Sequence, residues 1–77
     1  MAHIKDEQDR LLGEYLRKKR EEKGYSQQYI ADKLNVSKMA VSNWENGNRA
    51  IYATSLIKYC LAIGINPNDI VSELKFK

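Results

Sequence analysis

The stretch "VSKMAVSNWENG", from Val36 to Gly47, holds the side chains of this sequence best suited to recognising a partner. At about 100° per residue of an α-helix, its residues divide into two faces. The apolar face consists of Ala40, Val41 and Trp44. The opposite face consists of Lys38, Met39, Ser42, Asn43 and Asn46. Ser and Asn are poor helix formers, but their polar atoms donate and accept hydrogen bonds. We therefore interpret the outer face as a binding face that the apolar face holds in place.

The residue types that enzymes and metal sites need are not assembled in this sequence. The chain contains one His and one Cys, which supply neither a His-based catalytic triad nor a zinc site. We find no paired carboxylates and no glycine-rich phosphate-binding loop. Cys60 has no internal disulfide partner, which is typical of a reducing compartment. We expect a protein that is not an enzyme and binds no cofactor, metal or small-molecule ligand.

Length and composition indicate one compact domain. The chain has 77 residues, of which 43% are hydrophobic and 30% charged. We expect a single domain over residues 1–77, with a core over 12–74 and flexible ends at 1–5 and 75–77. No apolar run reaches the roughly 18–20 residues of a membrane span, and the N-terminus lacks the apolar segment of a signal peptide. The expected protein is soluble and cytoplasmic, without a membrane partner.

The net charge of +3 permits an anionic partner without requiring one. The basic run "RKKREEK", Arg17–Lys23, has the pattern of a solvated helix face, with Glu14 and Lys18 at the favourable i,i+4 spacing.

Residues that begin and end helices predict where the first three helices lie. Ser26 and Ser37 are expected N-caps, and Gly24 and Asn35 are expected to end the helices before them. They bound helices from Asp6 to Lys23, over 27–34, and from 38 to the Asn46–Gly47 pair. The expected core residues of the first two helices are Leu12, Tyr15, Leu16, Ile30, Ala31 and Leu34.

Two further helices are expected in the C-terminal third. In the fourth, the residues expected to face inward are Leu56, Ile57, Cys60 and Ile63, with Gly64 ending the helix. The fifth should begin with Asn66 as cap and Pro67 in the first helical position. Its expected inward residues are Ile70, Val71 and Leu74.

The second and third helices have the spacing of a helix-turn-helix. Ile30 is followed by the small Ala31, then by Leu34 and a turn at Asn35. A small residue is needed where two helices joined by a short turn cross closely. In this motif the second helix lies in the major groove of DNA.

From Leu12 to Leu74, the sequence resembles the Cro/CI-type (XRE-like) helix-turn-helix family, above all in "SQQYIADKL" followed by "WENG". The matching positions are Arg20, Gly24, Ser26, Gln27, Ile30, Ala31, Leu34, Val36, Ser37, Val41, Trp44–Gly47 and Leu56. The resemblance implies an all-α, compact five-helix, lambda-repressor-like DNA-binding domain. Members of the family are mostly bacterial or phage repressors and regulators.

The resemblance also implies roles for individual residues. The implied readers of base edges are Lys38, Met39, Ser42 and Asn43. The implied contacts to DNA phosphates are Gln27, Ser37, Asn46, Asn48 and Arg49. Arg20 and Glu45 are implied to form a structural pair that orients the loop after the third helix.

The chemistry of these side chains agrees with the implied roles. Lys38 can donate to guanine O6 or N7, and Asn43 can bridge N6 and N7 of adenine. Met39 suits a thymine methyl group, although a partly buried, gap-filling role is the alternative.

Several positions depart from the family pattern. Lys19 stands where the family usually has an apolar residue, so the first helix either packs loosely there or the Lys stem covers apolar surface. Ile51 and Tyr52 replace a common Pro and a common small cap, which leaves the start of the fourth helix uncertain. An exposed apolar patch is expected at Ile51, Tyr59, Leu61 and Phe76.

These observations predict a sequence-specific, double-stranded DNA-binding transcriptional regulator, a repressor rather than an activator. We expect a homodimer through the fourth and fifth helices, with Ile51, Leu61 and Phe76 as candidate contacts. The dimer would read a pseudo-palindromic operator. Two alternatives stay open: an antitoxin-type protein that neutralises a partner and binds DNA secondarily, and the DNA-binding module of a longer repressor.

Overall fold

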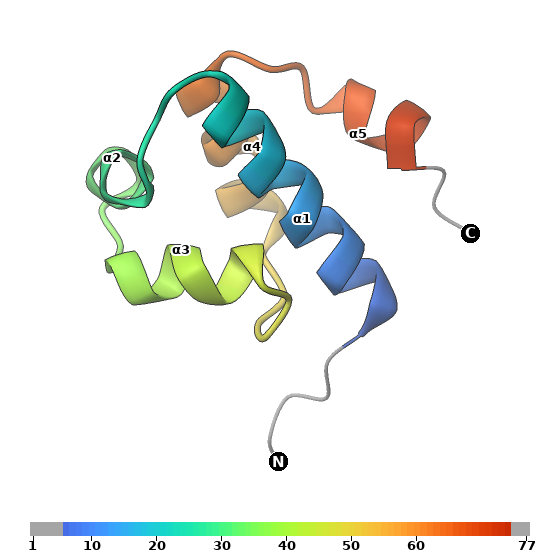
Figure 1. The fold of residues 1–77 in the computed structure, drawn as a ribbon, viewed down its shortest axis with the longest axis horizontal. Helices are drawn as coiled ribbons and strands as arrows, with labels where there is room; N and C mark the ends of the chain where they lie inside the picture. The colour runs from blue at the N-terminus through green and yellow to red at the C-terminus, as the bar shows by residue number, and fades with distance from the viewer. Residues whose placement is uncertain (1–5, 75–77) are drawn as a thin grey trace.

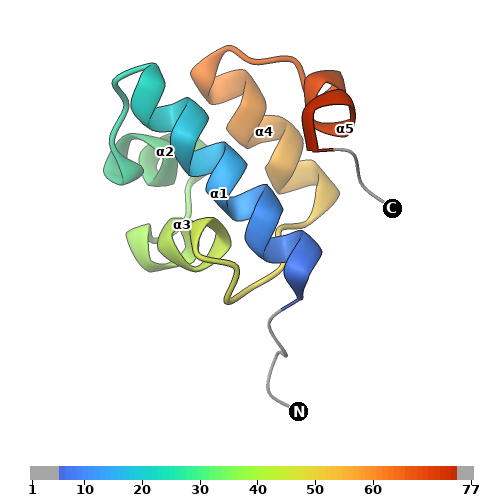
Figure 2. The same ribbon diagram turned by 45° about the vertical axis from the view of Figure 1, so that its right-hand side comes forward.

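A computed structural model describes residues 6–74, which form five helices and no strand. The helices are α1 (Glu7–Glu22), α2 (Gln27–Leu34), α3 (Lys38–Glu45), α4 (Ala53–Ile63) and α5 (Asn68–Leu74). α1 crosses the middle of the molecule and packs against α3, α4 and α5, while α2 packs against α3 and α4 (Figures 1 and 2). The prediction of an all-helical fold with α2 and α3 as a helix-turn-helix is confirmed.

The predicted helix ends are formed by the expected side chains. The Ser26 Oγ accepts a hydrogen bond from the Tyr29 amide, and the Ser37 Oγ accepts one from the Ala40 amide, both at 3.0 Å. Asn35 adopts the left-handed conformation at φ 56°, where it ends α2. α5 begins at Asn68, one residue after the predicted first position Pro67. The Asn66 Oδ1 accepts a hydrogen bond from the Asn68 amide at 2.9 Å, which agrees with the prediction of Asn66 as the cap.

The core forms where the helices meet. Its fully buried residues include Leu16 of α1, Ile30 of α2, Val41 of α3 and Cys60 of α4. Burial raises the pKa of the Cys60 thiol to about 11, so this cysteine is a protonated core residue at neutral pH.

Two residues that were expected to face inward are exposed. Ile57 is 48% exposed and Val71 is 66% exposed, so these two predictions are wrong. Each follows a correctly placed core-facing residue, Leu56 or Ile70, and one residue along a helix is a rotation of about 100°. That rotation carries the second apolar side chain out of the interface.

α1 and α3 approach each other at Gly13. A Cβ atom on Gly13 would lie 2.3 Å from the carbonyl oxygen of Trp44 and 2.6 Å from that of Glu45. Only a residue without a side chain permits this contact between helix backbones. The last turn of α3 therefore rests directly on α1.

The unusual Lys19 lies between α1 and α5. Its Nζ atom is 3.6 Å from Glu73 Oε1, 3.8 Å from Glu22 Oε1, and 5.5 Å from the centre of the Tyr15 ring. The side chain is 28% exposed. Of the two expectations for this position, the arrangement favours a Lys stem that covers apolar surface and a charged end that reaches carboxylates.

Along residues 6–74, no helix combines the length and the apolar character that crossing a membrane requires.

Candidate nucleic-acid interface

The outer face of α3 presents the four predicted base-reading side chains. Lys38 and Met39 are exposed, and Ser42 and Asn43 are half-buried on the turn that follows. Met39 is 69% exposed, which rules out the alternative of a buried gap-filler. An apolar side chain this exposed is available for contact with a partner.

The start of α2 meets this face. Gln27, the first residue of α2, joins Lys38, Met39 and Ser42 in lining a shallow hollow of about 330 Å³. The structure thus brings a predicted phosphate contact, Gln27, together with three predicted base readers.

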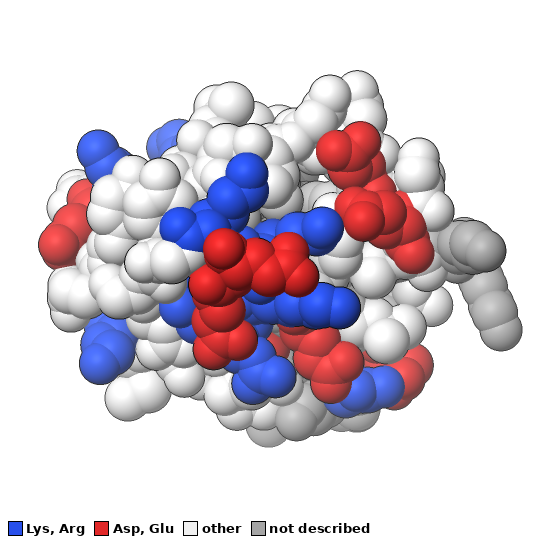
Figure 3. All heavy atoms as spheres, turned by 45° about the horizontal axis from the view of Figure 1, so that its top comes forward, with Lys and Arg blue, Asp and Glu red and all other residues white. Residues whose placement is uncertain are grey.

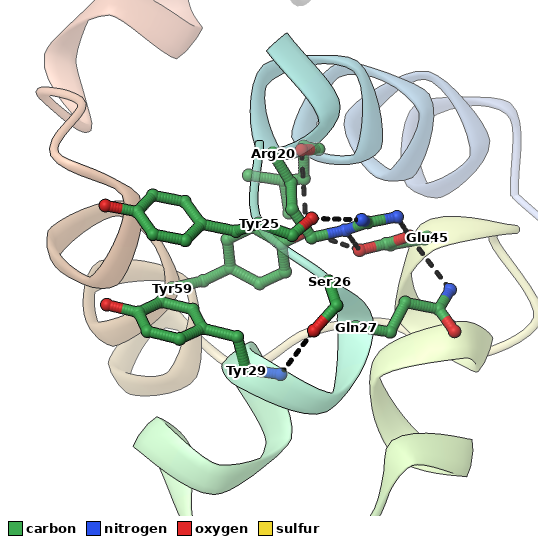
Figure 4. A network of polar contacts seen from close by, with 8 residues as sticks. Arg20, Tyr25, Ser26, Gln27, Tyr29, Glu45 and Tyr59 are labelled. Atoms are coloured by element: carbon green, nitrogen blue, oxygen red, sulfur yellow. Dashed lines mark hydrogen bonds and ion pairs between the residues drawn. The ribbon is translucent and has the colours of Figure 1, made fainter. Parts of the chain in front are cut away.

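A buried polar network holds the last residue of α3, Glu45, in place (Figure 4). The Arg20 Nε donates to Glu45 Oε2 at 2.8 Å, and the Arg20 Nη2 donates to Glu45 Oε1 at 2.9 Å. The Arg20 Nη1 donates to the carbonyl oxygen of Tyr25 at 2.7 Å, which ties the same guanidinium to the turn before α2. The predicted structural pair is present, and it is deeply buried.

Two further donors complete the shell of the Glu45 carboxylate. The Tyr59 hydroxyl donates to Glu45 Oε2, and the Gln27 Nε2 donates to Glu45 Oε1 at 3.1 Å. One carboxylate therefore connects α1, α2, α3 and α4. It also holds Gln27 at the edge of the outer face of α3.

The network keeps Glu45 ionised. Burial by itself raises the pKa of the Glu45 carboxyl, but the hydrogen bonds from Arg20, Tyr59 and Gln27 outweigh burial and hold that pKa below its usual value. Burial and the bond to Glu45 raise the pKa of the Tyr59 phenol far above its ordinary value, so the hydroxyl remains a donor.

Tyr59 is the functional residue that the sequence interpretation misplaced. It was expected in an exposed apolar patch, yet it is fully buried, and that prediction is wrong. Its hydrogen-bond partner Glu45 lies 14 residues away on another helix, beyond the reach of helical periodicity. The available signal was helical spacing, since Tyr59 lies three residues after Leu56 and four before Ile63, which both face the core.

The described remaining members of the expected patch, Ile51 and Leu61, differ in exposure. Ile51 is half-buried against the core, whereas Leu61 is 69% exposed on α4. Phe76 lies outside the described residues. Of the two candidate dimer contacts within residues 6–74, Leu61 is therefore the exposed one.

The loop after α3 carries the other predicted phosphate contacts. The Asn43 carbonyl oxygen accepts hydrogen bonds from the amides of Asn48 at 3.0 Å and Arg49 at 3.2 Å. The Asn46 Oδ1 accepts a second, side-chain bond from the Asn48 amide at 3.1 Å. Asn46, Asn48 and Arg49 are exposed on a loop of defined shape, and Ser37 is exposed at the other end of α3.

Charge on the surface is mixed on the face drawn in Figure 3. There, Lys and Arg side chains surround and alternate with Asp and Glu side chains. This mixture favours the interpretation of this part of the surface as solvated rather than as a continuous anion-binding patch. Within residues 6–74, no three His, Cys, Asp or Glu side chains gather where they could hold a metal ion.

Comparisons with known proteins agree with this geometry. A family model described as helix-turn-helix matches residues 16–70. The restriction-modification controller protein C.AhdI from Aeromonas hydrophila is 27% identical over 82% of this chain and 96% of its own, with a TM-score of 0.77. The clp gene regulator ClgR from Corynebacterium glutamicum is 28% identical over 87% of each chain, with a TM-score of 0.81.

A further similar structure is a hypothetical transcription factor, NHTF from Neisseria. It is 27% identical over 97% of this chain and 93% of its own, with a TM-score of 0.74. The sequence has no match among curated proteins.

Proposed function

The chain belongs to the XRE-type helix-turn-helix family of DNA-binding transcriptional regulators, and from that premise we propose that it is a sequence-specific repressor. It acts as a homodimer on a pseudo-palindromic operator. Each protomer inserts α3 into the major groove, with the two copies about 34 Å apart along one side of the duplex.

The observation that carries this proposal is the division of α3 into two faces. Lys38 and Met39 are exposed on the outer face, while Val41 and Trp44 are buried on the inner one. Glu45 fixes the last turn of α3 through its bonds to Arg20 and Tyr59. A helix so fixed presents side chains without a large entropic cost of ordering on binding. Hydrogen-bond donors and acceptors on such a helix suit the edges of bases in the major groove.

The proposed readers divide by chemistry. Lys38 donates to guanine, Asn43 bonds adenine through its amide, and Met39 packs on a thymine methyl group. Ser42 can donate to or accept from either kind of base.

The proposed phosphate contacts surround the readers. Gln27 lies at the start of α2, held by Glu45, and Ser37 lies before α3. Asn46, Asn48 and Arg49 follow α3 on the loop tied to Asn43. Contacts of this kind set the orientation of a protein on DNA and carry no sequence information.

Dimerisation is proposed through α4 and α5, where Leu61 and Val71 are exposed apolar residues. A two-fold axis relates two copies of one surface and places two α3 helices on one face of the duplex. Such a dimer accounts for a two-fold operator. Repression follows when occupancy of that operator blocks a promoter.

Selection of bound duplexes from a random pool tests the proposal. The expected product is an inverted repeat with half-site centres about 10 base pairs apart. Affinity for the selected duplex should fall steeply with salt, since each neutralised phosphate releases condensed counterions. Enrichment of no sequence, or an affinity that does not depend on salt, would contradict the proposal.

A further inference from the structure

A second hollow, of about 570 Å³, lies between α2 and the C-terminal half of α4. We call it the α2–α4 groove. It is lined on one side by Tyr29, Lys33 and Leu34 of α2, and on the other by Lys58, Leu61 and Ala62 of α4. None of the proposed base readers or phosphate contacts is among its lining residues. The function proposed above therefore leaves this groove without a role.

The α2 wall of the groove has a fixed aromatic surface. The Tyr29 ring stacks on the Tyr25 ring, with centroids 4.3 Å apart and an angle of 12° between the planes, as Figure 4 shows. The Tyr29 hydroxyl donates to the carbonyl oxygen of Ala62 at 3.3 Å, which joins this wall to the end of α4. A surface that is already ordered loses little conformational entropy when a partner covers it.

The centre of the groove is apolar. Leu61 is 69% exposed on α4, and Leu34 and Ala62 are half-buried. Covering this surface removes apolar area from water, which favours a ligand that also carries an aliphatic or aromatic side chain.

Two ammonium groups border this apolar centre. The Lys33 Nζ lies 5.5 Å from the centre of the Tyr29 ring, and Lys58 is exposed on α4. Neither ammonium pairs with a carboxylate of residues 6–74, and no Asp or Glu is among the lining residues. The carbonyl oxygen of Ala62 is already occupied by the Tyr29 hydroxyl. The groove therefore presents positive charge around an apolar centre.

We propose that the α2–α4 groove binds a short acidic segment of a second protein, in which an aliphatic or aromatic side chain lies between carboxylates. The apolar side chain packs on Tyr29, Leu34 and Leu61. The carboxylates on either side of it pair with Lys33 and Lys58. Complementary charge gives such a contact specificity and a fast association rate more than high affinity, so the binding is weak and depends on salt.

A protein segment suits the groove better than a DNA backbone does. Phosphates would satisfy the two ammonium groups, but they carry no apolar group that could cover Leu34 and Leu61. The base readers Lys38, Met39 and Ser42 line a separate hollow with Gln27, at the opposite end of α2 from Leu34. A protein held on DNA by α3 therefore keeps the groove open to a partner.

The groove borders the proposed dimer surface without coinciding with it. Leu61 belongs to both, but Val71 of α5 is not among the lining residues of the groove. Tyr29, Lys33 and Leu34 form a wall on α2, which is not part of the proposed dimer surface. A second copy at α4 and α5 therefore leaves the α2 wall available.

The first test selects binders from a random peptide library displayed on phage. The enriched peptides should share an aliphatic or aromatic residue with Asp or Glu on both sides. For a protein that carries both Lys33→Glu and Lys58→Glu, Lys and Arg should replace Asp and Glu in the enriched peptides. Trp44 emission during urea unfolding checks that this variant is folded. A consensus common to both proteins, or no consensus at all, would overturn the proposal.

The second test measures affinity for a labelled synthetic peptide of the enriched sequence by fluorescence anisotropy. Lys33→Ser and Lys58→Ser should each weaken binding about twofold to fivefold, the range of exposed ion pairs. Lys38→Ser is the matched control, since it removes the same charge from the outer face of α3, and its affinity should equal that of the unsubstituted protein. Equal losses from all three variants would show unspecific attraction between an acidic peptide and a basic protein, and would overturn the proposal.

Amide NMR spectra of the protein locate the bound peptide. The amide signals of Lys33 and Leu61 should shift more than those of Ser42 and Asn43 when the peptide is added. Shifts centred on Ser42 and Asn43 would place the peptide on the proposed DNA-binding face and contradict the assignment of the groove.

Affinity for the duplex obtained by selection separates this inference from the proposed function. Lys33→Ser and Lys58→Ser should bind that duplex no more weakly than Lys23→Ser, a change at an exposed position of α1's C-cap. A loss of DNA affinity confined to the two groove variants would assign the groove to phosphate and overturn the inference. If the unsubstituted protein selects no duplex, the proposed function fails, while the peptide measurements still decide the role of the groove.

Discussion

Arg20 and Glu45 form a two-bond ion pair across α1 and α3, with N–O distances of 2.8 and 2.9 Å. The pair is almost inaccessible to solvent, with side chains 8% and 2% exposed. A carboxylate on the proposed DNA-binding helix would repel phosphates if it faced them. Here its charge is neutralised inside the domain, and the same carboxylate holds Gln27 at the proposed interface.

The first prediction concerns the stability that this pair provides. Arg20→Ala should lower the free energy of unfolding by about 3–5 kcal/mol, because it leaves a buried carboxylate without its cation. Urea unfolding followed by Trp44 emission measures the change. Arg17→Ala, at an exposed position of the same helix, should stay within about 0.5 kcal/mol of the unsubstituted protein. Equal effects of the two changes would show that the pair is not structural.

The second prediction concerns acid. The pKa of Glu45 is lower in the folded protein than in the unfolded chain, so its contribution to stability is complete above the unfolded pKa. That contribution is lost as the pH falls below the unfolded pKa of Glu, about 4.3, and then through the lower pKa of the folded protein. Glu45→Gln should therefore flatten the fall in urea midpoint between about pH 5 and pH 3.

Glu73→Gln is the comparison for this measurement. The hydrogen bond from Tyr15, opposed by desolvation, lowers the pKa of the Glu73 carboxyl, but this carboxyl is exposed. Solvent screens an exposed pair, so its replacement should change the acid dependence less than Glu45→Gln does. Parallel pH profiles for the unsubstituted and Glu45→Gln proteins would contradict the assignment.

The third prediction concerns the contact between α1 and α3. Gly→Ala inside a helix normally stabilises a protein by about 1 kcal/mol. Gly13→Ala should instead destabilise this one by about 3 kcal/mol, since its Cβ would overlap the carbonyl oxygens of Trp44 and Glu45. Thermal unfolding followed by circular dichroism gives the sign.

Gly24→Ala serves as the control for this contact. A Cβ there meets nothing within 4 Å, but the φ of +84° is unfavourable for alanine. We expect a cost of only about 1–2 kcal/mol. A stabilising Gly13→Ala would mean that the two helices separate at little cost.

The fourth prediction separates base readers from phosphate contacts. Asn43→Ala should relax the preference at one operator position, with a loss of about 1–3 kcal/mol for the preferred base. Arg49→Ala should weaken all duplexes alike and reduce the salt slope by about one unit. Competition between the operator and its single-base variants measures both effects. If the two variants behave alike, the division of roles in the proposed interface is wrong.

Much of the fold was predictable because the ends of helices are determined by residues close to them in the sequence. Ser26, Ser37 and Asn35 act on amides or conformations within a few residues, and all three lie where they were predicted. The outer face of α3 was predictable for the same reason, since Lys38 and Met39 differ from Val41 by their angle around one helix.

The parts that sequence reasoning missed depend on contacts between distant segments. The hydrogen bonds from Tyr59 and from Gln27 to Glu45 were not predicted, because Glu45 lies 14 and 18 residues away on another helix. Ile57 and Val71 show that an apolar side chain does not by itself specify burial. Whether such a residue is covered depends on which arc of its helix the neighbouring helices occupy.

The carbonyl oxygen of Asn43 accepts hydrogen bonds from the amides of both Asn48 and Arg49, and this has a consequence for how the sequence of this protein can vary. Main-chain atoms alone form these bonds, so the course of the loop does not depend on which side chains occupy 48 and 49. Substitution at these two positions changes charge without moving the scaffold. In the proposed interface, overall affinity for DNA can therefore be adjusted through the loop, and sequence preference separately through α3.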